Sequence, residues 1–342
     1  MAKAFNRHFQ FLGSSKGAKP SGRLRFSNET ARTAPWLLLI VFVFAAVTTR
    51  SQTIAYVDVA VRNSQGKFLD ELSGSEFRLF VNGKQREIKQ ISMTAEPVSF
   101  AVLIDVSSSS FSTPFDSQLV PVNLYRHAVI EFLRHRQDED EYMLLSFSEN
   151  PELIMEFDSS AALVSALSED GPFAKPSGVR GTRLYDAINT AVEHLARSQY
   201  RKKVIILMSD TRDHLSSGRS KARADELLEQ YQVGVFSVSI EVAESRLGGR
   251  VYLPSRMDDV TDRAGGRRFW PNSRAELAEV MARISKWIDS QYRISFELEP
   301  ADHNRKRSRI EVRLELTSEQ RKELGRPLLD YRKHFSLLTD QK

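Results

Sequence analysis

The stretch "VSFAVLIDVSSSS", residues 98–110, indicates the fold class of this chain. It begins with a continuous apolar run that ends at Asp105, and four consecutive serines follow soon after. Such a run is typical of a strand that is buried on both faces of a parallel sheet. The aspartate and the serines would then lie where the chain leaves the carboxyl end of that strand.

Strands and helices alternate after this stretch. We predict strands at 141–147, 152–157, 203–209, 233–240 and in the short "RRFW", and helices at about 119–136, 160–168, 219–231, 274–291 and in "RLYDAINTAVEHLARSQ". A loop rich in Gly and Pro covers 171–181. Repeated strand–helix units of this length predict an α/β fold with a doubly wound, mostly parallel sheet.

The flanking segments read as short strands instead. "IAYVDVAVR" alternates apolar and polar residues, and "EFRLFVNGKQREIKQISM" predicts two strands joined at Asn82-Gly83, a strong hairpin signal. Near the other end, "QYRISFELEP" and "RSRIEVRLEL", residues 291–300 and 307–316, predict a second hairpin. Because two strands alone are marginal in water, we expect this hairpin to pair with residues 54–95 in one small β-rich module.

Four regions follow from these patterns. They are a basic leader at 1–50, a β module at 51–96, an α/β domain at 97–290, and a β-hairpin with a tail at 291–342 that packs on the β module.

The leader carries the excess positive charge of the chain. The whole sequence holds 49 Lys and Arg against 44 Asp and Glu, while residues 1–50 hold eight basic residues and Glu29 alone. The rest of the chain is therefore about neutral. This balance argues against a nucleic-acid partner, whose basic patch should lie in the folded domain.

The leader ends in an apolar segment, Trp36–Val47, of 12 residues. This is shorter than the ~20 residues of a comfortable membrane span but suits the core of a signal peptide, and small residues follow it. We expect an exported protein, in the periplasm or at the cell surface, whose only membrane contact is residues 36–49 if the leader stays uncleaved as an anchor. A buried hydrophobic helix is the alternative. The chain has no cysteine, so disulfides, zinc thiolates and a cysteine nucleophile are excluded.

Oxygen-bearing side chains follow several of the predicted strands. Asp105 ends one buried strand and Asp210 ends another, so both carboxylates should meet at one edge of the sheet. Ser107 and Ser109 follow the first aspartate, and Thr182 opens a helix at the same edge. Two carboxylates and three hydroxyls suit a hard divalent cation such as Mg²⁺, or Mn²⁺ or Ca²⁺. Taken singly, each residue is more often a turn or helix cap than a metal ligand, and only the joint pattern favours the cation.

The pattern Asp-x-Ser-x-Ser, then a Gly-Thr pair, then an aspartate after a buried strand resembles the metal-ion-dependent adhesion site of von Willebrand factor type A domains. The resemblance covers residues 97–290, and the flanking modules resemble a bacterial family of exported proteins related to these domains. It implies a Rossmann-like fold, and a cation held by the five residues named above. An open position on that cation would accept an Asp or Glu carboxylate from a protein partner.

Two positions depart from the pattern that this bacterial family often has. Thr211 and Ser108 stand where the family often has glycine. A positive φ at either position would cost a non-glycine residue on the order of 1 kcal/mol, so the departures bear on the affinity for the cation.

Enzyme functions have less support in the sequence. Ser107, His214 and Asp210 could be imagined as a triad, but no Gly-x-Ser-x-Gly elbow is present. We therefore predict a non-enzymatic binding or adhesion protein. A metal-dependent hydrolase and a structural module with a vestigial metal site are the two alternatives.

Overall fold

The computed structural model describes residues 53–93, 96–107, 121–171, 173, 181–209, 213, 215–239, 256–271, 273–303 and 306–336. The chain divides into two compact units, residues 1–50 and 51–342, and all described residues belong to the second.

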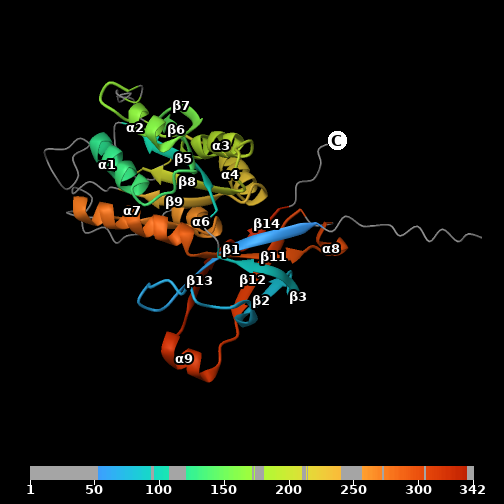
Figure 1. Ribbon diagram of the computed structural model, residues 1–342. Helices are drawn as coiled ribbons and strands as arrows, with labels where there is room; N and C mark the ends of the chain where they lie inside the picture. The colour runs from blue at the N-terminus through green and yellow to red at the C-terminus, as the bar shows by residue number, and fades with distance from the viewer. Residues whose placement is uncertain are drawn as a thin grey trace, which may run out of the picture. The chain divides into compact units, whose positions relative to one another are not determined.

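This unit contains one six-stranded sheet, on which the α/β domain is built, and two four-stranded sheets (Figure 1). The strand order of the six-stranded sheet is β10-β9-β8-β5-β6-β7, in which only β7 runs antiparallel to its neighbour. The strands are β5 (Val98–Asp105), β6 (Glu141–Phe147), β7 (Pro151–Asp158), β8 (Lys202–Met208), β9 (Gly234–Val238) and β10 (Arg267–Phe269). This mostly parallel sheet confirms the predicted fold class.

Helices cover both faces of the sheet. One hydrophobic cluster contains residues of α1 (Pro121–Leu133), α2 (Ser160–Ala166) and α7 (Arg274–Asp289). The opposite cluster contains residues of α3 (Leu184–Leu195), α4 (Gly218–Gln230) and α6 (Arg256–Arg263). The sheet is therefore a middle layer between two layers of helices.

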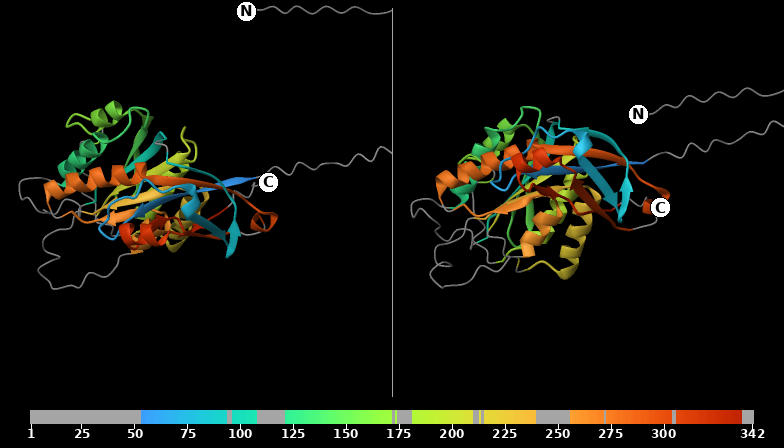
Figure 2. Two further views of the ribbon diagram at one scale, coloured as in Figure 1. Left: turned by 60° about the horizontal axis from the view of Figure 1, so that its bottom comes forward. Right: turned by 90° about the horizontal axis from the view of Figure 1, so that it is seen from below.

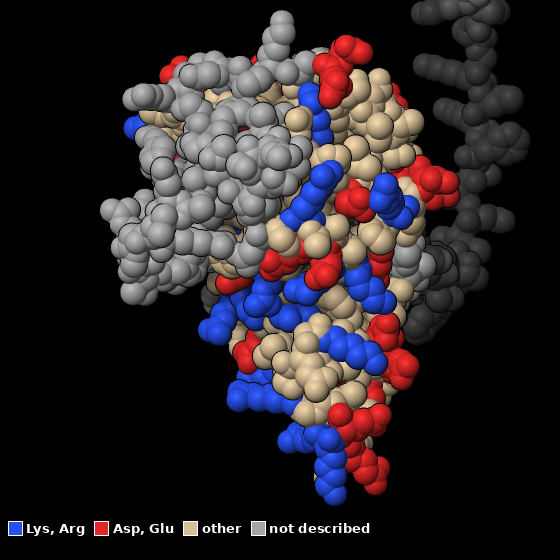
Figure 3. Space-filling view, turned by 90° about the vertical axis from the view of Figure 1, so that its left-hand side faces the viewer, with Lys and Arg blue, Asp and Glu red and all other residues tan. Residues whose placement is uncertain are grey.

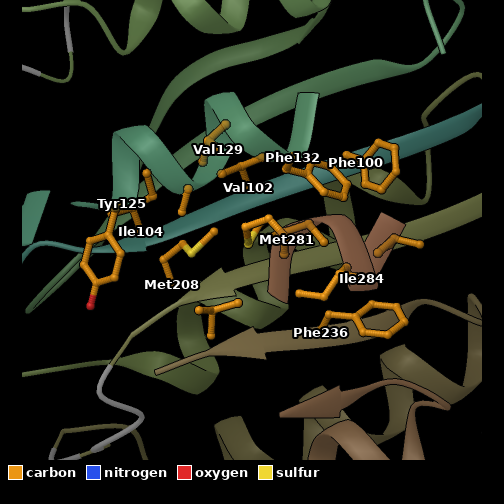
Figure 4. Close-up of a cluster of buried hydrophobic side chains, with 14 of the residues drawn as sticks. Phe100, Val102, Ile104, Tyr125, Val129, Phe132, Met208, Phe236, Met281 and Ile284 are labelled. Atoms are coloured by element: carbon orange, nitrogen blue, oxygen red, sulfur yellow. The ribbon is translucent and has the colours of Figure 1, made fainter. Parts of the chain in front are cut away.

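Strand β5 lies at the centre and is buried along its whole length. Its side chains alternate between the two cores: Phe100 and Ile104 belong to one cluster, while Leu103 belongs to the other. Figure 4 shows Phe100 and Ile104 lying with Phe132 of α1 in the first cluster. The apolar run in the sequence thus reflects burial on two faces, as predicted.

The flanking segments form two four-stranded sheets around one core, in the orders β13-β1-β11-β4 and β14-β12-β2-β3 (Figure 2). The strands are β1 (Ile54–Arg62), β2 (Phe77–Val81), β3 (Lys84–Arg86), β4 (Ile88–Ser92), β11 (Gln291–Glu297), β12 (Ser308–Leu314), β13 (Leu328–Tyr331) and β14 (His334–Phe335). Strand β1 pairs with β11 and β2 pairs with β12. Both chain ends therefore contribute to this β module.

The prediction that residues 291–300 and 307–316 form a hairpin is wrong. Strands β11 and β12 do not pair, because each lies in a different sheet. Both edges of β11 are occupied, by β1 and β4, while β12 lies between β2 and β14. The alternation in each strand was recognised, but alternation determines which face is buried and says nothing about the partner strand.

The predicted N-terminal hairpin is confirmed at its turn and corrected beyond it. Asn82 and Gly83 have φ angles of 51° and 81°, and Val81 pairs with Lys84 across them. Two positive φ values are characteristic of a type I′ hairpin turn. The strand that follows is broken, however: β3 stays with β2, whereas β4 pairs with β11 in the other sheet.

Short helices outside the sheet were not recognised from the sequence. They are η1 (Gly74–Glu76), α6, α8 (Pro300–His303) and α9 (Ser318–Leu324). Helix α9 has no buried residue and is stabilised at its start by a reciprocal capping box between Thr317 and Gln320. Such a helix lacks the apolar periodicity by which helices are recognised.

Basic and acidic side chains lie among one another on the face seen in Figure 3. Ion pairs among the described residues include Arg134 with Glu131 and Lys286 with Asp70. Among the residues described, no helix combines the length and the apolar character needed to cross a lipid bilayer.

Candidate metal-binding site

Asp105 ends strand β5 with a side chain that is 0% exposed. Its Oδ1 accepts a hydrogen bond from the backbone N–H of Ser107 at 2.9 Å, and its Oδ2 accepts one from the hydroxyl of Ser209 at 2.7 Å. The first contact is the local turn that a loop aspartate commonly forms. The second comes from another strand end, so Asp105 is more than a local cap.

The parallel register explains the contact with Ser209. Ile104 is paired with Met208 across β5 and β8, which places the next residues of both strands side by side at the carboxyl edge. Ser209 precedes Asp210 in the chain. Sequence reasoning missed Ser209, although alignment of the two buried strands at their ends would have found it.

Thr182 lies at the same edge of the sheet. The backbone N–H of Val106 donates to Phe147 O at the end of β6, and the N–H of Arg183 donates to the carbonyl of the next residue, Ser148. The segment that contains Thr182 is therefore attached beside the residues that follow Asp105.

The same segment is also tied to the loop after β8. The N–H of Leu215 donates to the carbonyl of Thr182 at 3.1 Å. Gly181 before it has φ +129°, and a Cβ there would lie 2.4 Å from Leu215 Cδ1. Glycine is needed at this position both for its backbone conformation and for the close approach of the leucine.

The side chain of Thr182 is 1% exposed, and its hydroxyl has no hydrogen-bond partner among the described residues. Buried hydroxyls nearly always have a partner, so this one calls for an explanation. A ligand held at the edge of the sheet is one such explanation.

The predicted ligand set is described only in part. Asp105, Ser107 and Thr182 are buried at the carboxyl edge of the sheet. Ser109 and Asp210 lie outside the described residues, as do Ser108, Thr211 and His214. Within the described ranges, no three His, Cys, Asp or Glu side chains form a metal-holding group. The predicted set has only two carboxylates, so this finding does not test it.

Two other acids near this edge have structural contacts of their own. Asp213 Oδ1 accepts hydrogen bonds from the N–H groups of Leu184 and Ser216, at 3.1 and 3.3 Å, and so caps the start of α3. Asp186 forms an ion pair with Arg183 at 3.3 Å. These contacts are the ordinary roles of a loop acid and of an acid on a helix surface.

Comparison with known protein families assigns this region. The family model of the von Willebrand factor type A domain matches residues 100–212. This part of the chain therefore has a von Willebrand factor type A (VWA)-like α/β fold. The matched segment of the VWA domain includes all five predicted ligand positions. Domains of this family generally mediate interactions between proteins.

Several solved structures are similar to the chain. The PilB minor pilin from Streptococcus sanguinis is 13% identical with a TM-score of 0.44, over 57% of this chain and 61% of PilB, so the chain spans less than two thirds of that protein. The conserved hypothetical protein BatB from Bacteroides thetaiotaomicron is 16% identical with a TM-score of 0.41, over 56% of this chain and 98% of BatB.

A von Willebrand factor type A protein from Catenulispora acidiphila is 13% identical with a TM-score of 0.45, over 85% of this chain and 76% of that one. No curated protein sequence matches the chain.

Proposed function

We propose that this chain is an exported binding protein whose VWA domain captures a protein partner through a divalent cation. The observation that carries the proposal is the buried, unpartnered hydroxyl of Thr182 at the sheet edge where Asp105 is also buried. Asp105, Ser107, Ser109, Thr182 and Asp210 would hold the ion, and when bound the cation would offer a coordination position to a carboxylate of the partner.

The residues fit such an ion chemically. Every predicted ligand supplies oxygen, the donor that Mg²⁺, Mn²⁺ and Ca²⁺ prefer. A buried hydroxyl left without a partner costs about 1–3 kcal/mol, and coordination would remove that cost. Asp105 is held at the strand end by its bonds to Ser107 and Ser209, which keeps the carboxylate in place before an ion arrives.

Replacing Thr182 by valine tests the role of the hydroxyl. Because the hydroxyl lacks a protein partner, Thr182→Val should leave the metal-free protein as stable as the parent or more stable. Affinity for Mg²⁺ should fall about tenfold or more, as expected when a ligand worth at least ~1.4 kcal/mol is lost. Thermal unfolding without metal and calorimetric titration with Mg²⁺ measure the two effects.

Thr190→Val is the matched control. Thr190 lies on α3 and its hydroxyl donates to Asp186 O at 3.0 Å, so this threonine already has a protein partner. The control should titrate with Mg²⁺ like the parent. Equal affinities for Mg²⁺ in the parent and in Thr182→Val would remove Thr182 from the ligand set.

Partner capture separates the proposed function from its alternatives. An adhesion module should lose its partner when a chelator is added and should turn over no small substrate. A metal-dependent hydrolase should show metal-dependent turnover without any protein partner. A structural module with a vestigial site should show neither metal binding nor chelator sensitivity.

Export is a separate part of the proposal and rests on the apolar segment at 36–47. Fusing alkaline phosphatase after residue 60 should give an active enzyme, because that enzyme folds to its active form only outside the cytoplasm. A fusion that is well expressed but inactive would show that the leader does not export the chain.

A further inference from the structure

A cavity of about 40 Å³ lies where the β module meets the VWA sheet. Its lining includes residues of β1, of β8 and of the segment after β13. The polar or charged members of the lining are Tyr56, Asp58, Lys202, Lys203, Gln232, Gln291 and Arg332. A water molecule needs roughly 10–15 Å³ of such space, so the cavity has room for a few waters or one small ion.

Arg332 is a buried cation in this lining, 9% exposed. Its guanidinium donates to the carbonyls of Leu228 at 2.6 Å and Ala264 at 3.4 Å. Among the described residues no carboxylate lies within ion-pair distance of it. Burial lowers the pKa of Arg332 to about 10, which indicates that its charge is poorly compensated.

Lys202, at the start of β8, is a second cation in the lining and is partly buried. Its ammonium donates to the carbonyl of Ile288 at 2.5 Å, and it forms no ion pair with the described carboxylates. Burial lowers the pKa of Lys202 as well. Two poorly compensated cations thus face one cavity from opposite modules.

The neighbouring carboxylates are already engaged. Asp58, the one carboxylate in the lining, accepts two hydrogen bonds from Arg293, at 2.8 and 3.0 Å, and Arg293 also pairs with Glu96. The charges of two further acids, Asp289 and Glu229, also act on these cations. Asp289 forms an ion pair with Arg136, and Glu229 forms one with Arg307.

The third lysine or arginine of the lining, Lys203, donates to Ser198 and Tyr200. The lining therefore holds three cations against one carboxylate whose two oxygens are already bound.

We propose that this cavity binds a small monovalent inorganic anion of chloride size, held between Lys202 and Arg332. A buried cation without an opposite charge nearby is costly, and an anion in this place neutralises charge on both sides at once. Since Arg332 follows β13 and Lys202 begins β8, the bound anion ties the last strands of the β module to the central sheet.

Thermal unfolding of the full chain in mild detergent tests the proposal with chloride as the probe. Sodium chloride is compared with sodium gluconate at equal sodium concentration and ionic strength. The melting temperature should be about 3 °C higher in chloride once chloride exceeds its Kd tenfold. Lys202→Met should lose this difference, whereas Lys286→Met, which removes an exposed lysine outside the cavity, should keep it.

Crystals of the parent soaked in bromide make the test independent of how well the variant folds. An anomalous peak between Lys202 and Arg332 is expected. Water alone in the cavity, an equal melting temperature in chloride and gluconate, or an equal chloride response in the parent and Lys202→Met would each overturn the proposal. A bromide peak without any chloride effect on melting would mean binding at crystal concentration only and would count against it.

Discussion

Replacing Asp105 by alanine is expected to abolish the binding of Mg²⁺ to the full chain. Asp105 is the only charged ligand predicted in the first metal loop, and hydroxyls alone are weak ligands for a hard divalent cation. The parent should gain thermal stability as Mg²⁺ is added, following mass action, and Asp105→Ala should gain none. Melting temperatures with and without Mg²⁺ measure the difference.

The structure also revises what the same variant should do without metal. Relief of the repulsion between Asp105 and a second carboxylate at the same sheet edge would, by itself, leave the metal-free variant as stable as the parent or more stable. Asp105 also accepts hydrogen bonds from Ser107 and Ser209, however, and alanine would remove the acceptor of both bonds. We now expect metal-free Asp105→Ala to be less stable by about 1–3 kcal/mol.

Two further variants make this prediction decisive. Asp105→Asn keeps the shape of the side chain while removing its charge, so it should fold better than the alanine variant and still fail to bind Mg²⁺. Asp186→Ala removes an acid of α3 that pairs with Arg183, and it should bind Mg²⁺ like the parent. If Asp105→Asn is stabilised by Mg²⁺ as much as the parent, Asp105 is not a ligand.

Deleting residues 292–342 is expected to unfold the whole β module. The deletion removes β12, β13, β14 and nearly all of β11, which leaves β1 without either of its neighbours. It also removes eight of the fifteen buried residues of the module's core. Each buried apolar side chain contributes about 1.5–3 kcal/mol, so the loss is comparable to the entire stability of a typical domain, about 5–15 kcal/mol.

Limited proteolysis with mass spectrometry measures this effect. New cleavage should appear throughout 54–92, because exposed strands are cut readily once they no longer pair. Deleting only 337–342, which removes no described strand, should leave the cleavage pattern of the parent. Protection of β1 and β2 in the longer deletion would show that the N-terminal strands fold without the tail.

The strands of the central sheet could be predicted because the burial of each strand is visible in the residues of that strand alone. Burial of β5 on both faces requires an apolar residue at almost every position, and "VSFAVLID" shows that requirement directly. The Asn82-Gly83 turn was equally readable, since two successive positive φ values are tolerated by few residue pairs.

Part of the candidate site could also be predicted from the sequence, because the predicted strands and helices determine which residues lie at the carboxyl edge of the sheet. Polar residues that follow buried parallel strands must lie at one edge of the sheet, so Asp105 could be placed there from the sequence. Thr182 could be placed at the same edge because it opens a helix there. The bond between Asp105 and Ser209 and the unpartnered hydroxyl of Thr182 could not, because they depend on side-chain positions within that edge.

Only the tertiary structure decided which strands pair in the β module and which charged side chains line the cavity at the start of β8. An alternating strand specifies a buried face but no partner, so β11 and β12 could join one sheet or two, and packing around the shared core put them in two. Lys202 and Arg332 are 130 residues apart in the chain, and each alone reads as an ordinary surface cation. They meet only in the folded chain, where residues from β1 and from the segment after β13 line one cavity together with the start of β8.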